Sequence, residues 1–161
     1  MFDVNEMEIN AAFYELFETT FGEDFFEVLA SMRPTKRIAS LRSRQKMISL
    51  NLKKANGESL TEDETELLAK NPGKWQELSE EEQEELLKWN IRTGALMKKQ
   101  TPRIAYIGTK LHKREYRGNM QDYYNFLASC DASDFLNPEI ITQVWEKVNT
   151  DQSLPKSVKN A

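Results

Sequence analysis

Helix start signals recur three times between residues 101 and 149, and they constrain the fold more than any other feature of the sequence. Apolar residues follow each signal at spacings of three and four, as on one face of a helix. Because only a few residues connect the segments, such helices must pack on one another. The sequence therefore predicts a three-helix C-terminal unit over residues 101–149. Each start combines a capping side chain with proline or an acid in the first turn, as in Thr101-Pro102, Asn119 with Asp122, and Asn137-Pro138-Glu139.

Opposite charges are segregated in the middle of the chain, residues 33–99. Residues 28–57 carry eight basic and no acidic side chains, whereas residues 58–85 carry eleven acids against two lysines. We interpret the two blocks as solvated faces that lie against each other within or between subunits.

The basic block predicts an amphipathic helix over residues 36–54, with its apolar side formed by Ile38, Leu41, Ile48 and Leu52. The alternative function of this helix is to contact nucleic acid, as a regulator would. Phosphate binding beside a strongly acidic block would be self-competed, so this alternative is the weaker one.

The acidic block contains two capping boxes, Thr61 with Glu64 and Ser79 with Glu82. The first predicts a short helix that ends before Asn71-Pro72-Gly73. The second predicts a helix from Ser79 to about Lys99 that ends at the Thr101-Pro102 start. We expect its apolar side to include Leu86, Leu87 and Ile91, and we expect Trp75 and Trp89 to seat these helices.

The aromatic N-terminal segment, residues 1–32, is ambiguous between strand and helix. Apolar residues from Met7 to Phe21 fit both periods, so a small β-hairpin and a helix stay open as alternatives. Residues 23–32 predict a short helix that ends before Pro34. We expect the phenylalanines of this segment to be core residues, with an exposed apolar patch as the alternative.

Length and composition indicate one helical domain over residues 1–150 and a flexible polar tail over residues 151–161. The chain has 161 residues, a net charge of −4 and a single cysteine, which excludes an internal disulfide. No apolar run approaches the roughly 20 residues of a membrane span. Asp3, Glu6 and Glu8 stand where a secretory signal would carry positive charge. We therefore expect a cytoplasmic protein that binds neither membrane nor nucleic acid.

No residue set predicts catalysis, a metal site or a cofactor, so we do not expect an enzyme. His112 is the only histidine, and it stands among lysines and an arginine, while Cys130 lies on an apolar stripe. Glycine-rich phosphate loops and CxxC motifs are absent from the sequence. A carboxylate-based enzyme stays open only as a third reading.

Two stretches of the C-terminal third, together spanning about 50 residues, are "IAYIGTKLHKRE" and "GNMQDYYNFLASCDASDFLNPEIITQVWEKV". In these stretches the chain resembles the tail assembly chaperones of long-tailed phages and prophages of Gram-positive bacteria. The elements of this resemblance are packing motifs: the helix around Ile104–Ile107, the segment Asp122–Leu127, the turn Asp134–Leu136 and the start Asn137-Pro138-Glu139. Residues 1–30 are faintly similar to the start of the family, which would favour the hairpin, and the charged segment from Arg33 to Lys99 is longer than the family's pattern.

The resemblance implies a mostly α protein, an array of short helices that can stack as a spiral in a homo-oligomer. It implies binding to the tape measure protein and recruitment of tail-tube subunits in the host cytoplasm, often with a second, frameshifted product, and absence from the mature virion. For partner or subunit contacts we single out five aromatic residues, although for each one taken singly a core position is favoured: Tyr106, Tyr123, Tyr124, Phe126 and Trp145. The charge blocks would then set the register of neighbouring subunits.

Overall fold

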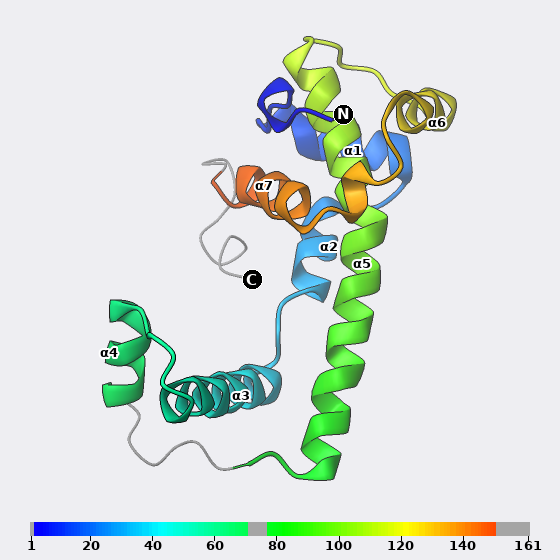
Figure 1. The fold of residues 1–161 in the computed structure, drawn as a ribbon. Helices are drawn as coiled ribbons and strands as arrows, with labels where there is room; N and C mark the ends of the chain where they lie inside the picture. Colours follow the sequence, from blue (N-terminus) through cyan, green and yellow to red (C-terminus); the bar gives the residue numbers. More distant parts are fainter. Residues whose placement is uncertain (1, 71–76, 151–161) are drawn as a thin grey trace. The chain divides into compact units, whose positions relative to one another are not determined.

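The structure is a computed structural model that describes residues 2–70 and 77–150. Within these ranges every regular element is helical and no strand occurs, which confirms a mostly α fold (Figure 1). The predicted tail at 151–161 and Trp75 lie outside the described residues. The elements are η1 (Val4–Glu6), α1 (Ala12–Phe21), α2 (Phe25–Ser31), α3 (Lys36–Ala55), α4 (Glu62–Lys70), α5 (Glu80–His112), α6 (Met120–Ser129), η2 (Asp134–Leu136) and α7 (Pro138–Asn149).

The chain divides into two compact units. Unit 1 comprises residues 1–33 and 93–161, and unit 2 comprises residues 34–92. The bounds of unit 2 are similar to those of the charged middle segment, residues 33–99, that was defined from the sequence. Helix α5 begins in unit 2 and ends in unit 1.

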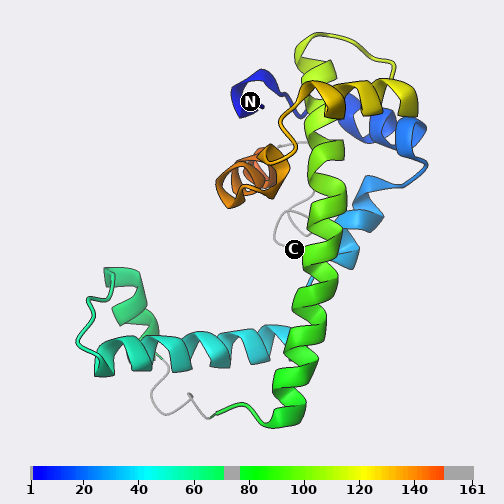
Figure 2. The same cartoon turned by 45° about the vertical axis from the view of Figure 1, so that its right-hand side comes forward.

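Unit 1 has an aromatic core around the second half of α5. Figures 1 and 2 show α1, α6 and α7 around this part of the helix. Phe13 and Phe17 of α1 each hold their ring centroid 4.9 Å from that of Phe25 of α2. Ile104 and Ile107 of α5 are completely buried in the same cluster. Edge and tilted ring contacts of this kind add to the free energy of burial.

The N-terminal segment is helical, so the β-hairpin alternative is wrong. Residues Phe13, Leu16, Phe17 and Thr20 are buried at the spacing of one helix face. Helix α1 then ends at Gly22, whose φ of 69° is a left-handed conformation that glycine adopts without strain. Packing of this face against the core decides between the two periods that fitted the sequence.

The helix start predicted at Thr101-Pro102 is wrong, because α5 runs without interruption from Glu80 to His112 with Pro102 inside it. Thr101 is completely buried and does not cap. Its hydroxyl donates to the carbonyl of Met97 at 2.6 Å and accepts the indole N–H of Trp145 at 2.9 Å. Packing on both sides of Pro102 thus outweighs the backbone hydrogen bond that a proline removes.

The other two predicted starts in this region are confirmed. The Asn119 side chain accepts from the backbone N–H of Asp122 at 2.8 Å, where α6 begins. The Asn137 side chain accepts from the backbone N–H of Glu139 at 2.9 Å, and Pro138 is the first residue of α7. The C-terminal region therefore contains two separate helices and the end of a long one.

Unit 2 consists of α3, α4 and the first part of α5. Both predicted capping boxes are formed, with Glu64 and Thr61 and likewise Glu82 and Ser79 exchanging backbone and side-chain hydrogen bonds of 3.0–3.1 Å. A small apolar cluster joins α3 to α5 and contains Ile38, Leu41, Leu78 and Leu86.

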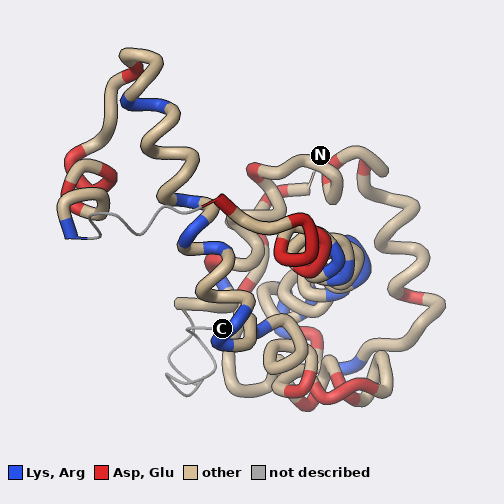
Figure 3. The backbone as a smooth tube through the Cα atoms, turned by 90° about the horizontal axis from the view of Figure 1, so that it is seen from below, with Lys and Arg blue, Asp and Glu red and all other residues tan. Residues whose placement is uncertain are grey.

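The two charge blocks lie against each other within the chain, as the sequence indicated. In Figure 3 the first turns of α5 are red, which marks the glutamates there. The guanidinium of Arg42 also lies 5.1 Å from the ring centroid of Trp89. The ion pairs are Arg37 with Glu85 at 2.8 Å, Arg44 with Glu82 at 2.6 Å and Lys53 with Glu64 at 3.6 Å.

The apolar side of α3 differs from the predicted stripe after its first half. Ile38 and Leu41 are buried as expected, but Leu52 is 59% exposed. Met47 and Leu50 are buried in its place. The predicted stripe assumed one straight face, whereas α3 packs against α5 near its start and contacts α4 near its end.

Candidate interaction surfaces

The five aromatic residues predicted for partner contacts lie mainly in the core of unit 1. Tyr106, Tyr123 and Trp145 are only 2%, 6% and 8% exposed, and Phe126 is partly buried. The ring of Tyr106 lies 5.4 Å from that of Tyr123 and 5.6 Å from that of Phe126. Tyr124 alone of the five exposes more than half of its surface, 56%. The three buried rings shape the surface through packing, and direct contact by Tyr124 stays a prediction.

Tyr106 belongs to a polar network that fastens α6 to α5. Its hydroxyl donates to a carboxylate oxygen of Asp122 at 2.7 Å, and the ammonium of Lys110 donates to the same oxygen at 2.7 Å. Burial, together with this hydrogen bond, raises the pKa of Tyr106 to about 12. Hydrogen bonds from Lys110 and Tyr106 lower the pKa of Asp122. These shifts follow from burial of Tyr106 and from pairing between the two helices, which is a structural role.

A second polar contact holds the turn before α2 against α5. The carboxylate of Glu23 accepts from Gln100 at 3.0 Å and from Arg103 at 2.9 Å, and it pairs with Lys99 at 3.2 Å. Although burial opposes it, the hydrogen bonds to Lys99 and Gln100 lower the pKa of Glu23. This contact, too, fixes the packing of unit 1.

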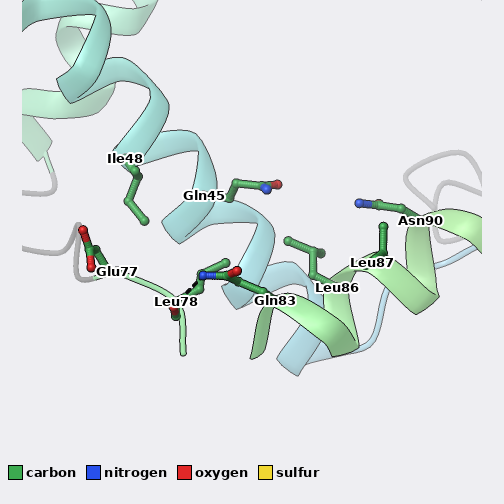
Figure 4. Close-up of a pocket in the computed structure, with 8 residues that line it drawn as sticks. All are labelled: Gln45, Ile48, Glu77, Leu78, Gln83, Leu86, Leu87 and Asn90. Carbon is green, nitrogen blue, oxygen red and sulfur yellow. Dashed lines mark hydrogen bonds between the residues drawn. The ribbon is translucent and has the colours of Figure 1, made fainter. Parts of the chain in front are cut away.

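Unit 2 has an open groove of about 560 Å³ between α3 and the start of α5 (Figure 4). The α3 side is formed by Gln45 and Ile48, and the floor contains the buried Leu78 and Leu86. Amides and one carboxylate surround this apolar centre. The full lining is Gln45, Ile48, Glu77, Leu78, Gln83, Leu86, Leu87 and Asn90.

Hydrogen bonds fix the segment before α5 that forms part of the groove. The side-chain amide of Gln83 donates to the carbonyl of Leu78 at 3.0 Å, as the dashed line in Figure 4 shows. The guanidinium of Arg44 donates to the carbonyl of Glu77 at 2.9 Å and also pairs with Glu82. The segment before α5 is therefore tied both to its own helix and to α3.

Exposed apolar side chains continue the groove along α5. Leu87 is 57% exposed and Ile91 is 64% exposed, and their separation by four residues places them on one face of the helix. From the sequence, both were placed with Leu86 on the apolar side of this helix. The adjacent pair Leu86-Leu87 was the available signal, because neighbours in a helix point about 100° apart, so the two side chains face a small cluster to different extents.

The basic helix offers fewer free cations than its sequence indicated. Arg37, Arg44 and Lys53 of α3 pair with glutamates of α4 and α5, and Arg42 lies over Trp89. Such pairing reduces the attraction for phosphate. Nucleic-acid binding by residues 36–54 therefore stays a prediction with less support, which binding to random duplex DNA at low salt would test.

Apolar side chains and neutral amides predominate in the lining of the groove. The lining contains one ionisable residue, Glu77, beside leucine, isoleucine and neutral amides.

In residues 2–70 and 77–150 no three His, Cys, Asp or Glu side chains are arranged to hold a metal ion. No helix in these ranges has the length and apolar character to cross a bilayer. Burial raises the pKa of the Cys130 thiol, so the thiol form is favoured.

The chain matches no known protein-family profile, no curated protein and no solved structure.

Proposed function

We propose that the protein is a tail assembly chaperone of a long-tailed phage or prophage. It binds the tape measure protein in the host cytoplasm, helps recruit tail-tube subunits, acts as a homo-oligomer and leaves before the virion is complete. This proposal unites the resemblance of residues 101–149 with a surface suited to hold an apolar helix. It requires no catalytic group or cofactor.

The observation that carries the proposal is the groove of unit 2 with Leu87 and Ile91 beside it. Exposed leucine and isoleucine next to an apolar groove on a small charged protein mark an interaction surface. An amphipathic helix binds such a groove through apolar residues spaced three and four apart. A tape measure protein is expected to be long and helical with such a stripe, so it fits the surface.

The test is co-expression of the chain with the tape measure protein encoded beside its gene, followed by affinity capture and a solubility measurement. The proposal expects a soluble complex from the unmodified chain. The double variant Leu87→Ser/Ile91→Ser should lose the complex while remaining helical by circular dichroism. The control is Leu136→Ser, which changes a 64% exposed leucine in unit 1 and should leave capture unchanged.

Two results would contradict the proposal. One is a tape measure protein that stays insoluble and uncaptured with the unmodified chain. The other is a neighbouring gene set without tail-tube and tape measure genes, because a chaperone of this kind is encoded between them.

A further inference from the structure

We infer that the groove of unit 2 takes an amphipathic helix whose charged residues are basic. The inference rests on the proposed function, because it treats the groove as the binding site, and it adds the chemical class of the bound helix. It is carried by the charges that border the groove.

The walls of the groove are neutral along α3. Gln45, Ile48 and Leu52 share one face of this helix at spacings of three and four. Arg44, which precedes Gln45 in α3, is already bound to Glu82 and to the carbonyl of Glu77. Helix α3 is basic overall, yet the two residues with which it lines the groove, Gln45 and Ile48, are uncharged.

Negative charge gathers where α5 begins. Glu77 lines the groove, and Glu80 and Glu84 lie on the face of α5 that carries Leu87. Glu84 pairs with Lys88 at 3.0 Å. For Glu77 and Glu80, the described part of the chain supplies no ion-pair partner, and both residues are exposed.

The surface is thus an apolar groove with carboxylates at one end for which the described residues supply no ion-pair partner. A bound helix whose apolar stripe is flanked by lysine or arginine would complement it, and a helix flanked by glutamate would be repelled. The same carboxylates would repel an anionic membrane surface or a nucleic-acid backbone. The favoured occupant is therefore a basic amphipathic helix of a protein partner.

The experiment uses the full chain and three labelled 18-residue peptides, with binding measured by fluorescence anisotropy. One peptide places leucines at i, i+3, i+4 and i+7 among lysines. The second replaces lysine by glutamate at every position, and the third scrambles the leucine and lysine order. We expect the first peptide to bind on the order of tenfold or more tightly than either of the others, since 1.4 kcal/mol corresponds to a tenfold change.

Matched charge variants locate the effect. Glu77→Lys/Glu80→Lys should weaken binding of the leucine–lysine peptide by on the order of tenfold. The control Glu58→Lys/Glu62→Lys makes the same change of charge. It too alters one residue in a loop, Glu58, and the first residue of a helix, Glu62 of α4, and it should leave the affinity unchanged. Leu87→Ser/Ile91→Ser should remove the binding.

Equal binding of the lysine and glutamate peptides, or equal loss in the two charge variants, would overturn the inference. Equal binding of the scrambled peptide would overturn it as well, because this result indicates unspecific attraction. Failure to capture the tape measure protein while the leucine–lysine peptide binds would contradict the proposed function alone. Capture of the tape measure protein that Glu77→Lys/Glu80→Lys leaves intact would contradict this inference alone.

Discussion

Aromatic rings fill the interior of unit 1, whereas unit 2 joins its helices through ion pairs and a small aliphatic cluster. In unit 1 the rings of Phe13, Phe17 and Phe25 contact one another, and each of these residues is at most 1% exposed to solvent. In unit 2 the ion pairs join side chains that stay partly or largely exposed. Exposed ion pairs contribute little free energy. Among the described residues, the buried apolar cluster of unit 2 is also smaller than that of unit 1, so burial of apolar surface stabilises unit 2 less.

This difference bears on where a partner would bind under the proposed function. Unit 1 holds a fixed scaffold, in which even polar groups such as Thr101 and Tyr106 are bound inside the structure. Unit 2 leaves Leu87 and Ile91 exposed beside a groove, at a cost in stability that binding of a partner would offset. Under the proposed function, the region with the smaller core is the one that carries the surface for the partner.

The largest expected effect is the loss of a core ring in unit 1. Replacing Phe17, which is completely buried, by alanine should lower the free energy of unfolding by about 3–5 kcal/mol. Denaturant titration of a variant that keeps Trp145 as its only tryptophan reports on unit 1. Phe17→Leu serves as the control and should lose much less. A similar small loss in both variants would contradict an aromatic core.

The sequence predicted most helix starts of the chain, but not the continuation of α5 through Pro102. Capping residues located the starts of α4, α5, α6 and α7, because cap hydrogen bonds are local and depend on neighbouring residues. Thr101-Pro102 carried the same local signal, yet the helix continues there because Trp145 and the core hold it. Local signals therefore fail where tertiary packing opposes them.

The groove could be predicted only in part, for a similar reason. The pairing of charge blocks followed from their opposite sign, and the ion pairs between α3 and α5 agree with it. Which of Leu86 and Leu87 faces the cluster depends on how α5 is rotated against α3, and one stripe of apolar residues does not fix that rotation. The exposed pair Leu87 and Ile91 therefore had to come from the structure.

A second test compares two glycines within α5. A β-carbon on Gly108 would lie 2.8–2.9 Å from side-chain atoms of Met7 in the N-terminal segment. The backbone N–H of the next residue, Glu8, donates to the Gly108 carbonyl. Gly108→Ala should therefore destabilise unit 1 by about 1–3 kcal/mol through overpacking. Gly94 has nothing within 4 Å of the same position, so Gly94→Ala should stabilise the helix by up to about 1 kcal/mol.

Opposite signs for these two variants in thermal or denaturant unfolding would confirm that the N-terminal segment packs on α5 as described. Destabilisation of equal size at both positions would contradict it, because a general intolerance of alanine in this helix would then explain the result.

A smaller effect is expected from the Tyr106 network, and it depends on pH. The folded-state pKa of Tyr106 is about 12, above its ordinary value of 10.0, so the folded state holds this proton more tightly. The stabilisation is complete below pH 10 and is lost as the pH rises from about 10 to about 12. In Tyr106→Phe this component is absent, and the lost hydrogen bond to Asp122 costs about 1 kcal/mol at neutral pH. Unfolding free energies at pH 7, 10 and 11.5 should therefore converge for the two proteins, and a constant difference would contradict the assignment.

The smallest effects should come from the ion pairs of unit 2, and salt distinguishes them from the core of unit 1. Arg44→Gln removes the pair with Glu82, which is partly exposed, and should cost about 0.2–1 kcal/mol at low ionic strength. Because salt screens exposed charges, the difference between this variant and the unmodified chain should shrink in 1 M sodium chloride. The signal is the fluorescence of Trp89 in a variant that keeps it as the only tryptophan. Lys88→Gln is the control, since its pair with Glu84 lies within one helix turn and does not join α3 to α5. A salt-independent loss in Arg44→Gln would show that Arg44 acts through its hydrogen bond to the Glu77 carbonyl, and the stability of unit 2 would then rest on its shape more than on its charge.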